Sequence, residues 1–150
     1  MRAVLQRVSR ASVNIEGQLH AQIGKGFLIL LGIEESDTRE DVLYLSSKIA
    51  NLRVFEDADG KMNEDIRQQS GALLIISQFT LFAATKKGNR PSFIRAARPE
   101  TAIPLYEAFI AQMKEDSGVP VQTGVFGADM KVDLINDGPV TILFDSKNKE

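Results

Sequence analysis

The stretch Asn136-Asp137-Gly138-Pro139-Val140-Thr141 lies between two segments in which apolar and polar side chains alternate. A period of two over 130–135 and again over 140–145 is typical of strands with one buried face. Asn, Asp and Gly between such runs favour a tight turn, so the sequence predicts a β-hairpin here. Pro139 fits this hairpin poorly, because proline donates no hydrogen bond to a strand ladder.

Two interpretations of Pro139 follow. It is either the first residue of the return strand, or part of a cis Gly138-Pro139 peptide that serves a function beyond the turn. Only ~5–6% of X–Pro bonds in folded proteins are cis, so the second interpretation needs support from elsewhere in the chain.

The rest of the chain predicts one mixed α/β domain over residues 1–150. The apolar runs at 27–33 and 71–76 predict buried strands, and apolar residues at helical spacing predict helices that begin near Asp37 and Pro99. Asp37 and Glu40 have the spacing of a capping box for the first helix. Further short strands, expected at 2–8, 11–15, 53–55, 61–63 and 119–123, make the sheets largely antiparallel.

Composition excludes several classes of protein. Hydrophobic residues at 43% and charged residues at 25% are typical of globular proteins. No apolar run reaches the ~18–20 residues that span a bilayer, and the N-terminal residues lack the apolar core of a signal peptide. We therefore expect a cytoplasmic protein without membrane contact. The chain has no cysteine and only one histidine, His20, which excludes thiolate and multi-histidine metal sites.

Charge is distributed unevenly along the chain. Residues 34–65 hold ten acidic and four basic side chains, whereas residues 82–99 hold five basic side chains and no acid. A basic segment in a nearly neutral protein is compatible with binding the phosphates of a nucleic acid, although an ordinary solvated surface would look the same. The candidates for phosphate contacts are Lys86, Lys87 and Arg90.

A second motif is Ser77-Gln78-Phe79-Thr80, which follows directly from a predicted buried strand. Hydroxyl and amide groups at the end of a rigid element are typical of a functional site. Together with the stretch 136–141, and with 1–8 and 88–93, this motif resembles the D-aminoacyl-tRNA deacylase family. The resemblance covers essentially the whole chain.

This resemblance implies a barrel-like deacylase fold and a homodimeric enzyme without metal or organic cofactor. Its substrate would be the ester between a D-amino acid and the 3′-terminal adenosine of tRNA, so that the activity proofreads chirality in translation. Gly138-Pro139 would be a cis peptide that projects into the partner's active site and rejects L-amino acids. The other implied residues are catalytic Ser77, Gln78, Phe79 and Thr80, gate-supporting Arg7 and Asn136, tRNA-binding Lys86, Lys87 and Arg90, and an adenosine pocket of Phe93, Phe126 and Met130.

The role of Thr80 stays open between a nucleophile and a residue that orients a group while the RNA 2′-hydroxyl assists water. A threonine nucleophile needs an adjacent base, and no Lys or carboxylate lies within four residues of Thr80. We therefore favour main-chain donors and positioning as the source of catalysis. A rigid backbone wall would reject an L side chain by steric conflict and would not exclude glycyl-tRNA.

Two other functions remain possible from the sequence. One is a non-catalytic RNA-binding dimer, which the missing base favours. The other is a threonine-dependent hydrolase of small D-amino acid esters, which would not need the basic segment. Arg7 likewise could be an ordinary salt-bridged arginine in place of a support for the gate.

Overall fold

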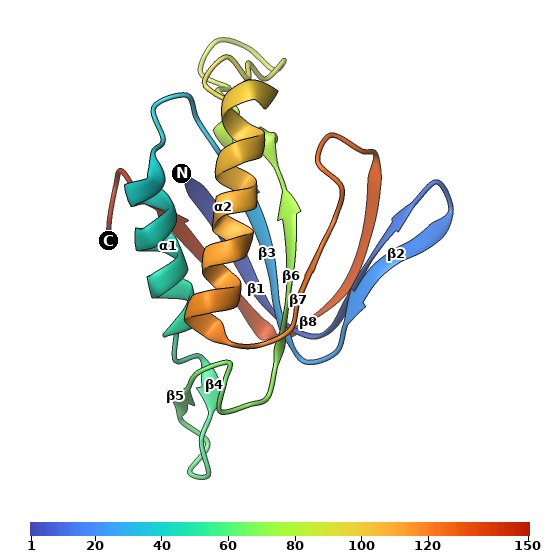
Figure 1. Cartoon of the computed structure of the whole chain (residues 1–150), viewed down its shortest axis with the longest axis vertical. Helices are drawn as coiled ribbons and strands as arrows, with labels where there is room; N and C mark the ends of the chain where they lie inside the picture. The colour runs from blue at the N-terminus through green and yellow to red at the C-terminus, as the bar shows by residue number, and fades with distance from the viewer.

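The computed structural model describes all 150 residues as one mixed α/β domain, in which two helices cover a curved, nearly closed sheet (Figure 1). The predicted fold class, with two main helices and a barrel-like arrangement of strands, is confirmed. The elements are β1 (Arg2–Ile15), β2 (Gln18–Ile23), β3 (Gly26–Gly32), α1 (Arg39–Ala50), β4 (Phe55–Glu56), β5 (Met62–Glu64), β6 (Ala72–Ser77), the 3-10 helix η1 (Phe79–Phe82), α2 (Pro99–Ser117), β7 (Val121–Thr123) and β8 (Met130–Asp145).

The long strand β1 organises the sheet. One of its edges pairs antiparallel with β8 along its whole length. Its other edge pairs with β3 over residues 2–8 and with β2 over residues 11–15. Two separate strands were predicted for this segment, but β1 is continuous. Its ladder with β8 resumes at Arg10 after an irregularity at Ser9, which has no partner. β6 and β7 extend the β3 edge in parallel.

The predicted closing hairpin is wrong. β8 is a single strand over residues 130–145, and both of its halves pair with β1. Val8 pairs with Asn136 and Gln6 pairs with Thr141, so the four residues 137–140 lie opposite the single residue Arg7. The turn residues therefore form a large bulge and do not reverse the chain.

Two hydrophobic cores lie on opposite faces of β3 and β6. The first lies beneath the helices and includes Leu5, Phe27 and Phe109. The second lies where β2 and the ends of β1 and β8 curve over the sheet, and it includes Leu28 and Leu74. β3 is therefore buried on both faces, as its continuous apolar sequence predicts. Neither helix is long and apolar enough to cross a membrane.

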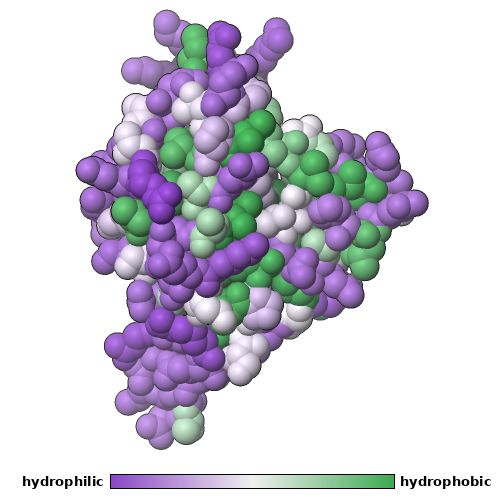
Figure 2. Space-filling view, viewed as in Figure 1, coloured by the Kyte–Doolittle hydropathy of each residue, from purple (hydrophilic) through white to green (hydrophobic).

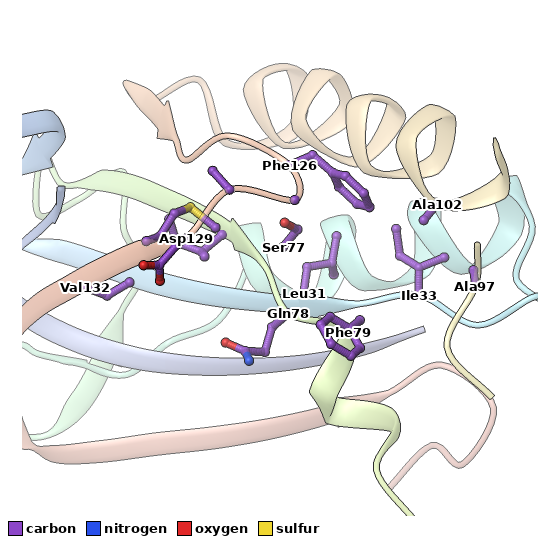
Figure 3. A pocket seen from close by; sticks show the side chains of 14 residues that line it. Leu31, Ile33, Ser77, Gln78, Phe79, Ala97, Ala102, Phe126, Asp129 and Val132 are labelled. Carbon is purple, nitrogen blue, oxygen red and sulfur yellow. The ribbon is translucent and has the colours of Figure 1, made fainter. Parts of the chain in front are cut away.

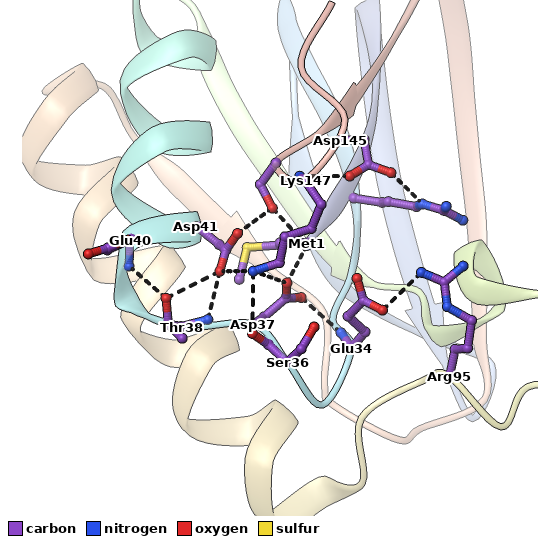
Figure 4. Close-up of polar contacts among 12 residues, drawn as sticks. Met1, Glu34, Ser36, Asp37, Thr38, Glu40, Asp41, Arg95, Asp145 and Lys147 are labelled. Carbon is purple, nitrogen blue, oxygen red and sulfur yellow. Dashed lines mark hydrogen bonds and ion pairs between the residues drawn. The ribbon is translucent and has the colours of Figure 1, made fainter.

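Polar contacts fix the start of α1 and the two ends of the chain (Figure 4). The capping box of α1 is formed by Thr38 and Asp41, not by the predicted Asp37 and Glu40. Asp37 instead binds the ammonium group of Met1 at 2.5 Å, and both side chains are fully buried. Ser146 donates to Asp41 at 2.6 Å. Both ends of the chain are therefore tied to the first turn of α1.

The start of α2 is held by a carboxylate from another part of the chain. Glu35 accepts hydrogen bonds from the Arg98 N–H at 2.7 Å and from the Thr101 hydroxyl at 2.9 Å. These contacts take the place of the missing side-chain cap at Arg98. They also fix the C-terminal end of the basic segment against the loop that follows β3.

Candidate active site

The carboxyl end of β6 opens into a pocket of about 320 Å³ (Figure 3). This volume is near the lower end of the ~300–1,000 Å³ range of small-molecule sites. Ten of its fourteen lining residues are hydrophobic. The residues that concern the chemistry are Ser77, Gln78 and Phe79 from the end of β6, and Phe126, Asp129 and Met130 from the loop before β8 and the start of β8.

The backbone changes direction directly beside this pocket. The Gln78 N–H still donates to the Leu31 carbonyl oxygen at 2.7 Å, as if β6 continued. The next residues leave the sheet and begin the 3-10 helix η1. As a result, the N–H groups of Phe79 and Thr80 donate to no acceptor within the protein. The turn thus leaves two consecutive main-chain donors free next to Ser77 and Gln78.

The structure separates Thr80 from the other three residues of its motif. Ser77, Gln78 and Phe79 line the pocket, and Thr80 does not. The Gln78 side-chain amide donates to the Thr80 hydroxyl oxygen. The only ionisable lining residue is Asp129, whose side chain is 85% exposed and pairs with Lys131. Thr80 therefore has an amide donor as its neighbour and no base.

His20 cannot fill the role of a base in this pocket. It lies on β2, which forms no part of the pocket, and it is exposed. No group of three or more His, Cys, Asp or Glu side chains is arranged to hold a metal ion.

The bulge in β8 is closed by Asn136. Its side-chain oxygen accepts from the Val140 N–H at 2.8 Å, and its amide donates to the Thr141 hydroxyl at 3.0 Å. The Gly138–Pro139 peptide is cis, as the family resemblance implies, and residues 137–139 are exposed.

Arg7 holds the bulge from beneath. Its guanidinium is buried and donates from Nε to the Asp137 carbonyl oxygen at 2.9 Å. From Nη1 it donates to the Val54 carbonyl oxygen at 2.5 Å, and it lies over the ring of Phe55. The carboxylate of Asp137 is 3.8 Å away and half exposed, so the main-chain carbonyl is the closer partner. Arg7 is thus a main-chain clamp and not an ordinary salt-bridged arginine.

The three candidate residues for an adenosine pocket fall into two groups. Phe126 and Met130 line the pocket. Phe93 does not, and instead packs edge-to-face on Phe79 with ring centroids 5.1 Å apart. The Phe126 ring is tilted against Tyr106, whose hydroxyl donates to the Ile75 carbonyl oxygen at 3.0 Å. Burial raises the pKa of Tyr106 to about 12, so this donor stays protonated.

The basic residues lie on a loop beside the same end of the sheet. Reciprocal hydrogen bonds between Ala84 and Ser92 close this loop. Lys86, Lys87 and Arg90 lie inside it, are exposed and take part in no ion pair. Arg95 differs, because it pairs with Glu34 at 2.9 Å. In Figure 2 this loop and the β4–β5 hairpin form the hydrophilic ends of the molecule, while apolar side chains gather between them.

Several pocket residues were not predicted from the sequence. Apolar lining residues come from β3, α2 and β8, among other segments. In the sequence these residues cannot be told apart from ordinary core residues. Val132 belongs to the alternating pattern before residue 136, which indicates only which face of a strand it occupies. Two contacts outside the lining were also not predicted: the Tyr106 hydroxyl donates to the Ile75 carbonyl oxygen, and the Val54 carbonyl oxygen accepts from Arg7. The sequence has no signal for either contact.

An apolar pocket rimmed by a hydroxyl, an amide and free main-chain N–H groups is typical of sites for acyl or ester chemistry. Fold and site together define a small α/β protein with a site suited to acyl or ester chemistry. The comparisons with known proteins identify it further. The chain belongs to the D-Tyr-tRNA(Tyr) deacylase family, whose model matches residues 4–145.

The similarity to relatives covers the complete chain. The chain is 61% identical to the D-aminoacyl-tRNA deacylase of Bacteroides thetaiotaomicron and 60% identical to that of Flavobacterium psychrophilum, over 100% of each protein. Among solved structures, a c-Myc DNA Unwinding Element Binding Protein has a TM-score of 0.90 at 41% identity, covering 97% of this chain and 98% of that one. A second solved structure, titled as that of "a probable eukaryotic D-amino acid tRNA deacylase", shares the fold with a TM-score of 0.80 at 16% identity. The match covers 95% of this chain and 97% of that one.

Proposed function

We propose that this protein hydrolyses the ester bond of D-aminoacyl-tRNA and releases the free D-amino acid and tRNA in the cytoplasm. The observation that carries this proposal is full-length identity of 61% to a D-aminoacyl-tRNA deacylase, in a chain whose pocket is rimmed by Ser77, Gln78 and Phe79. The activity would remove wrongly charged D-amino acids before translation uses them.

Catalysis is assigned mainly to the main chain. The free N–H groups of Phe79 and Thr80 would donate to the oxygen that becomes negative when water attacks the ester carbonyl. The terminal ribose 2′-hydroxyl would assist the water, and the 3′-oxygen leaves with a proton. Because an activated ester needs less assistance than an amide, positioning and two donors are sufficient without a protein base. The Thr80 hydroxyl keeps Gln78 in place.

Chiral selection is assigned to the exposed bulge at Gly138 and Pro139. D- and L-amino acids carry the same groups, and a difference of one methylene is worth only ~1–3 kcal/mol in a side-chain pocket. A main-chain wall that grips the α-amino group and occupies the space of an L side chain discriminates by steric conflict instead. Glycyl-tRNA carries no side chain on either hand and would pass this wall.

The bulge is proposed to serve the pocket of a second copy of the chain. Within one chain, the bulge on β8 lies opposite Arg7 on β1, Arg7 pairs with Phe27 on β3, and Phe27 pairs with Leu73 on β6. Ser77, at the pocket, is four residues further along β6. This path spans three strand spacings and four residues along β6, which places the bulge ~20 Å from its own pocket. The bulge is therefore too far away to act on a substrate in that pocket.

An uncovered sheet face supports a homodimer. Val4 pairs with Leu143 on the face opposite the helices, where β2 no longer covers the sheet. Leu143 is 75% exposed, and Leu81 lies beside it in a surface pocket that both residues line. A partner that covers this face would remove apolar surface from water and bring each bulge to the other subunit.

One assay tests the proposed function. The purified protein is incubated with D-tyrosyl-tRNA, L-tyrosyl-tRNA, glycyl-tRNA and D-tyrosine methyl ester, and loss of each ester is followed. We expect fast loss from D-tyrosyl-tRNA, measurable loss from glycyl-tRNA and none above background from L-tyrosyl-tRNA. Equal rates with the D- and L-forms would contradict the assigned chirality, and strong rejection of glycyl-tRNA would contradict the steric wall.

The same assay addresses the two other candidate functions. Binding of tRNA without any turnover would identify a non-catalytic RNA-binding dimer, which the absence of a base in the pocket favours. Faster loss of the methyl ester than of D-tyrosyl-tRNA would indicate a hydrolase of small esters. The position of Thr80 outside the pocket lining argues against a threonine-dependent version of that enzyme.

A further inference from the structure

We propose that the side chain of Phe79, backed by Phe93, is a stacking subsite for the nucleotide that precedes the terminal adenosine of the RNA. This inference rests on the proposed function and extends it outside the pocket. It assigns a second base-binding position, on the rim, in addition to the enclosed position beside Phe126 and Met130.

The size of the pocket requires such a position. At about 320 Å³ it is close to the smallest volume typical of small-molecule sites, and it must accept the aminoacyl group as well as the adenosine. No room remains inside for a second nucleotide. The RNA chain must therefore leave the pocket at the phosphate of the terminal adenosine.

Phe79 has the exposure and packing of a stacking surface. Its side chain lines the pocket rim and is 57% exposed, which is unusual for a phenylalanine (Figure 3). Phe93 meets it edge-to-face, with an angle of 76° between the ring planes. This contact fixes the Phe79 ring from one side while much of its surface remains in contact with water. Unpaired bases stack on exposed aromatic side chains of this kind in many RNA-binding proteins.

Charge indicates the direction in which the RNA leaves. Phe93 belongs to the segment 82–99, which has no acidic residue. The exposed cations Lys86, Lys87 and Arg90 precede Phe93 in the same loop. A strand that passes from the pocket over Phe79 therefore meets Phe93 and then unpaired positive charge. On the side of the pocket before β8 it would instead meet Asp129, whose carboxylate is paired with Lys131.

A second apolar side chain extends the surface. Residues 93–96 form a turn closed by the Ala96 N–H on the Phe93 carbonyl oxygen at 3.0 Å. Ile94 lies at the tip of this turn and is 88% exposed. No contact inside the chain explains an isoleucine there, whereas an unpaired base beyond Phe79 would cover it.

The test uses two short substrates that differ in a single base. One is the trinucleotide cytidyl-cytidyl-adenosine with D-tyrosine esterified to its terminal adenosine. The other has an abasic residue in place of the penultimate cytidine, so that every phosphate is kept. We expect the wild-type protein to lose roughly fivefold or more in kcat/KM on the abasic substrate, the effect of one lost base–aromatic stack. Phe79→Leu should process both substrates at similar rates, and Phe79→Tyr should restore the difference.

The ratio between the two substrates is the measured quantity, so a general loss of activity in a variant does not affect the conclusion. Ile94→Ser should reduce the ratio partially, and Leu19→Ala, an exposed apolar residue on β2, should leave it unchanged. A wild-type ratio near one would overturn the inference. A ratio that persists in Phe79→Leu, together with a shift toward monomer in sedimentation, would overturn it too and would assign Phe79 to contact with a second copy. If no D-tyrosyl substrate were hydrolysed at all, the proposed function itself would fail.

Discussion

Arg7 donates from Nε to the carbonyl oxygen of Asp137 at 2.9 Å, and thereby fixes the main chain of the bulge next to Gly138. Its second bond, to the Val54 carbonyl oxygen, ties the same guanidinium to the segment before β4. The position of the exposed bulge is thus set by a buried side chain on the neighbouring strand. This arrangement anchors the bulge to the body of the domain through its main chain.

The first prediction concerns this clamp. Lysine at position 7 keeps the charge but cannot donate to two carbonyl groups in the fixed geometry of a guanidinium. We expect Arg7→Lys to lower the free energy of unfolding by about 2 kcal/mol. The ratio of kcat/KM for D-tyrosyl-tRNA over L-tyrosyl-tRNA should fall about tenfold, which corresponds to ~1.4 kcal/mol of lost discrimination.

Arg10→Lys is the matched control, because Arg10 lies on the same strand in an exposed ion pair with Asp133. It should change stability by less than ~0.5 kcal/mol and leave the ratio unaltered. An unchanged D/L ratio in Arg7→Lys would show that the clamp does not set selectivity.

The second prediction concerns Gly138. Its φ of 144° is favourable for glycine, and an added Cβ would lie 2.9 Å from the Val140 nitrogen and 2.8 Å from its Cγ2. Gly138→Ala should therefore displace the bulge and lower the D/L ratio, at a cost of ~1–3 kcal/mol in stability. Gly17→Ala is the control, since Gly17 also has a positive φ but no atom within 4 Å of an added Cβ. If both variants kept the wild-type ratio, the bulge would not be the chiral gate.

The third prediction concerns Thr80. Because its hydroxyl lies outside the pocket lining and accepts from Gln78, Thr80→Ala should retain deacylation of D-tyrosyl-tRNA within about tenfold. Thr80→Ser should retain more, because the acceptor remains. Single-turnover rates give the comparison. A loss in Thr80→Ala beyond ~10³-fold, the size expected for removal of a principal catalytic group, would assign Thr80 as the nucleophile.

Basic residues of the loop lead to a fourth prediction. If Lys86, Lys87 and Arg90 each contact a phosphate, each alanine substitution should lower the slope of log affinity for tRNA against log salt concentration by ~0.7–0.9. Lys61→Ala, at an exposed position beside β5, serves as the control and should not change the slope. Weaker binding with an unchanged slope would mean that the loop acts through folding and not through phosphate contacts.

The fifth prediction concerns acid stability. Burial disfavours the charged form of Asp41, but hydrogen bonds from Ser146, Lys147 and Thr38 outweigh burial and hold its pKa well below the ordinary value. A carboxyl whose pKa is lower in the folded state stabilises the protein above roughly pH 4, its unfolded pKa, and this contribution is lost as the pH falls. Asp41→Asn should therefore destabilise the protein strongly near pH 7 and progressively less between about pH 4 and pH 2.

Urea unfolding of wild type and Asp41→Asn at several pH values measures this effect. A difference in unfolding free energy that stayed constant across the range would show that the carboxylate charge does not contribute.

Local sequence signals predicted elements well but could not assign their partners. The alternation on both sides of Asn136 correctly indicated strands, since in each half of β8 one face is more buried than the other. It could not reveal that both halves pair with β1, because a period of two is independent of the partner strand. Asn136 itself explains the wrongly predicted hairpin. Its side chain bonds to Val140 and Thr141, as a turn residue would, but the segment that these bonds enclose is a bulge within one strand.

The candidate site was likewise predicted only in part, because local sequence signals do not reveal contacts between distant segments. Ser77, Gln78 and Phe79 were singled out because polar groups at the end of a buried strand are visible in the sequence, and all three line the pocket. The free N–H groups arise from the change to a 3-10 helix, which no residue type in that motif indicates. Asp37 was assigned to the helix cap on spacing alone, whereas the ammonium group of Met1, distant in sequence, is its actual partner.

In the function proposed above, the bulge in β8 separates selectivity from folding. β8 pairs with β1 on both sides of residues 137–140, so these four residues are an insertion that contributes no pair to the ladder between the two strands. Evolution could therefore alter the length, residues or conformation of this insertion while the core remains the same. A domain built in this way can acquire a new stereochemical or steric preference by changes in four residues, provided that a side chain such as Arg7 still holds them.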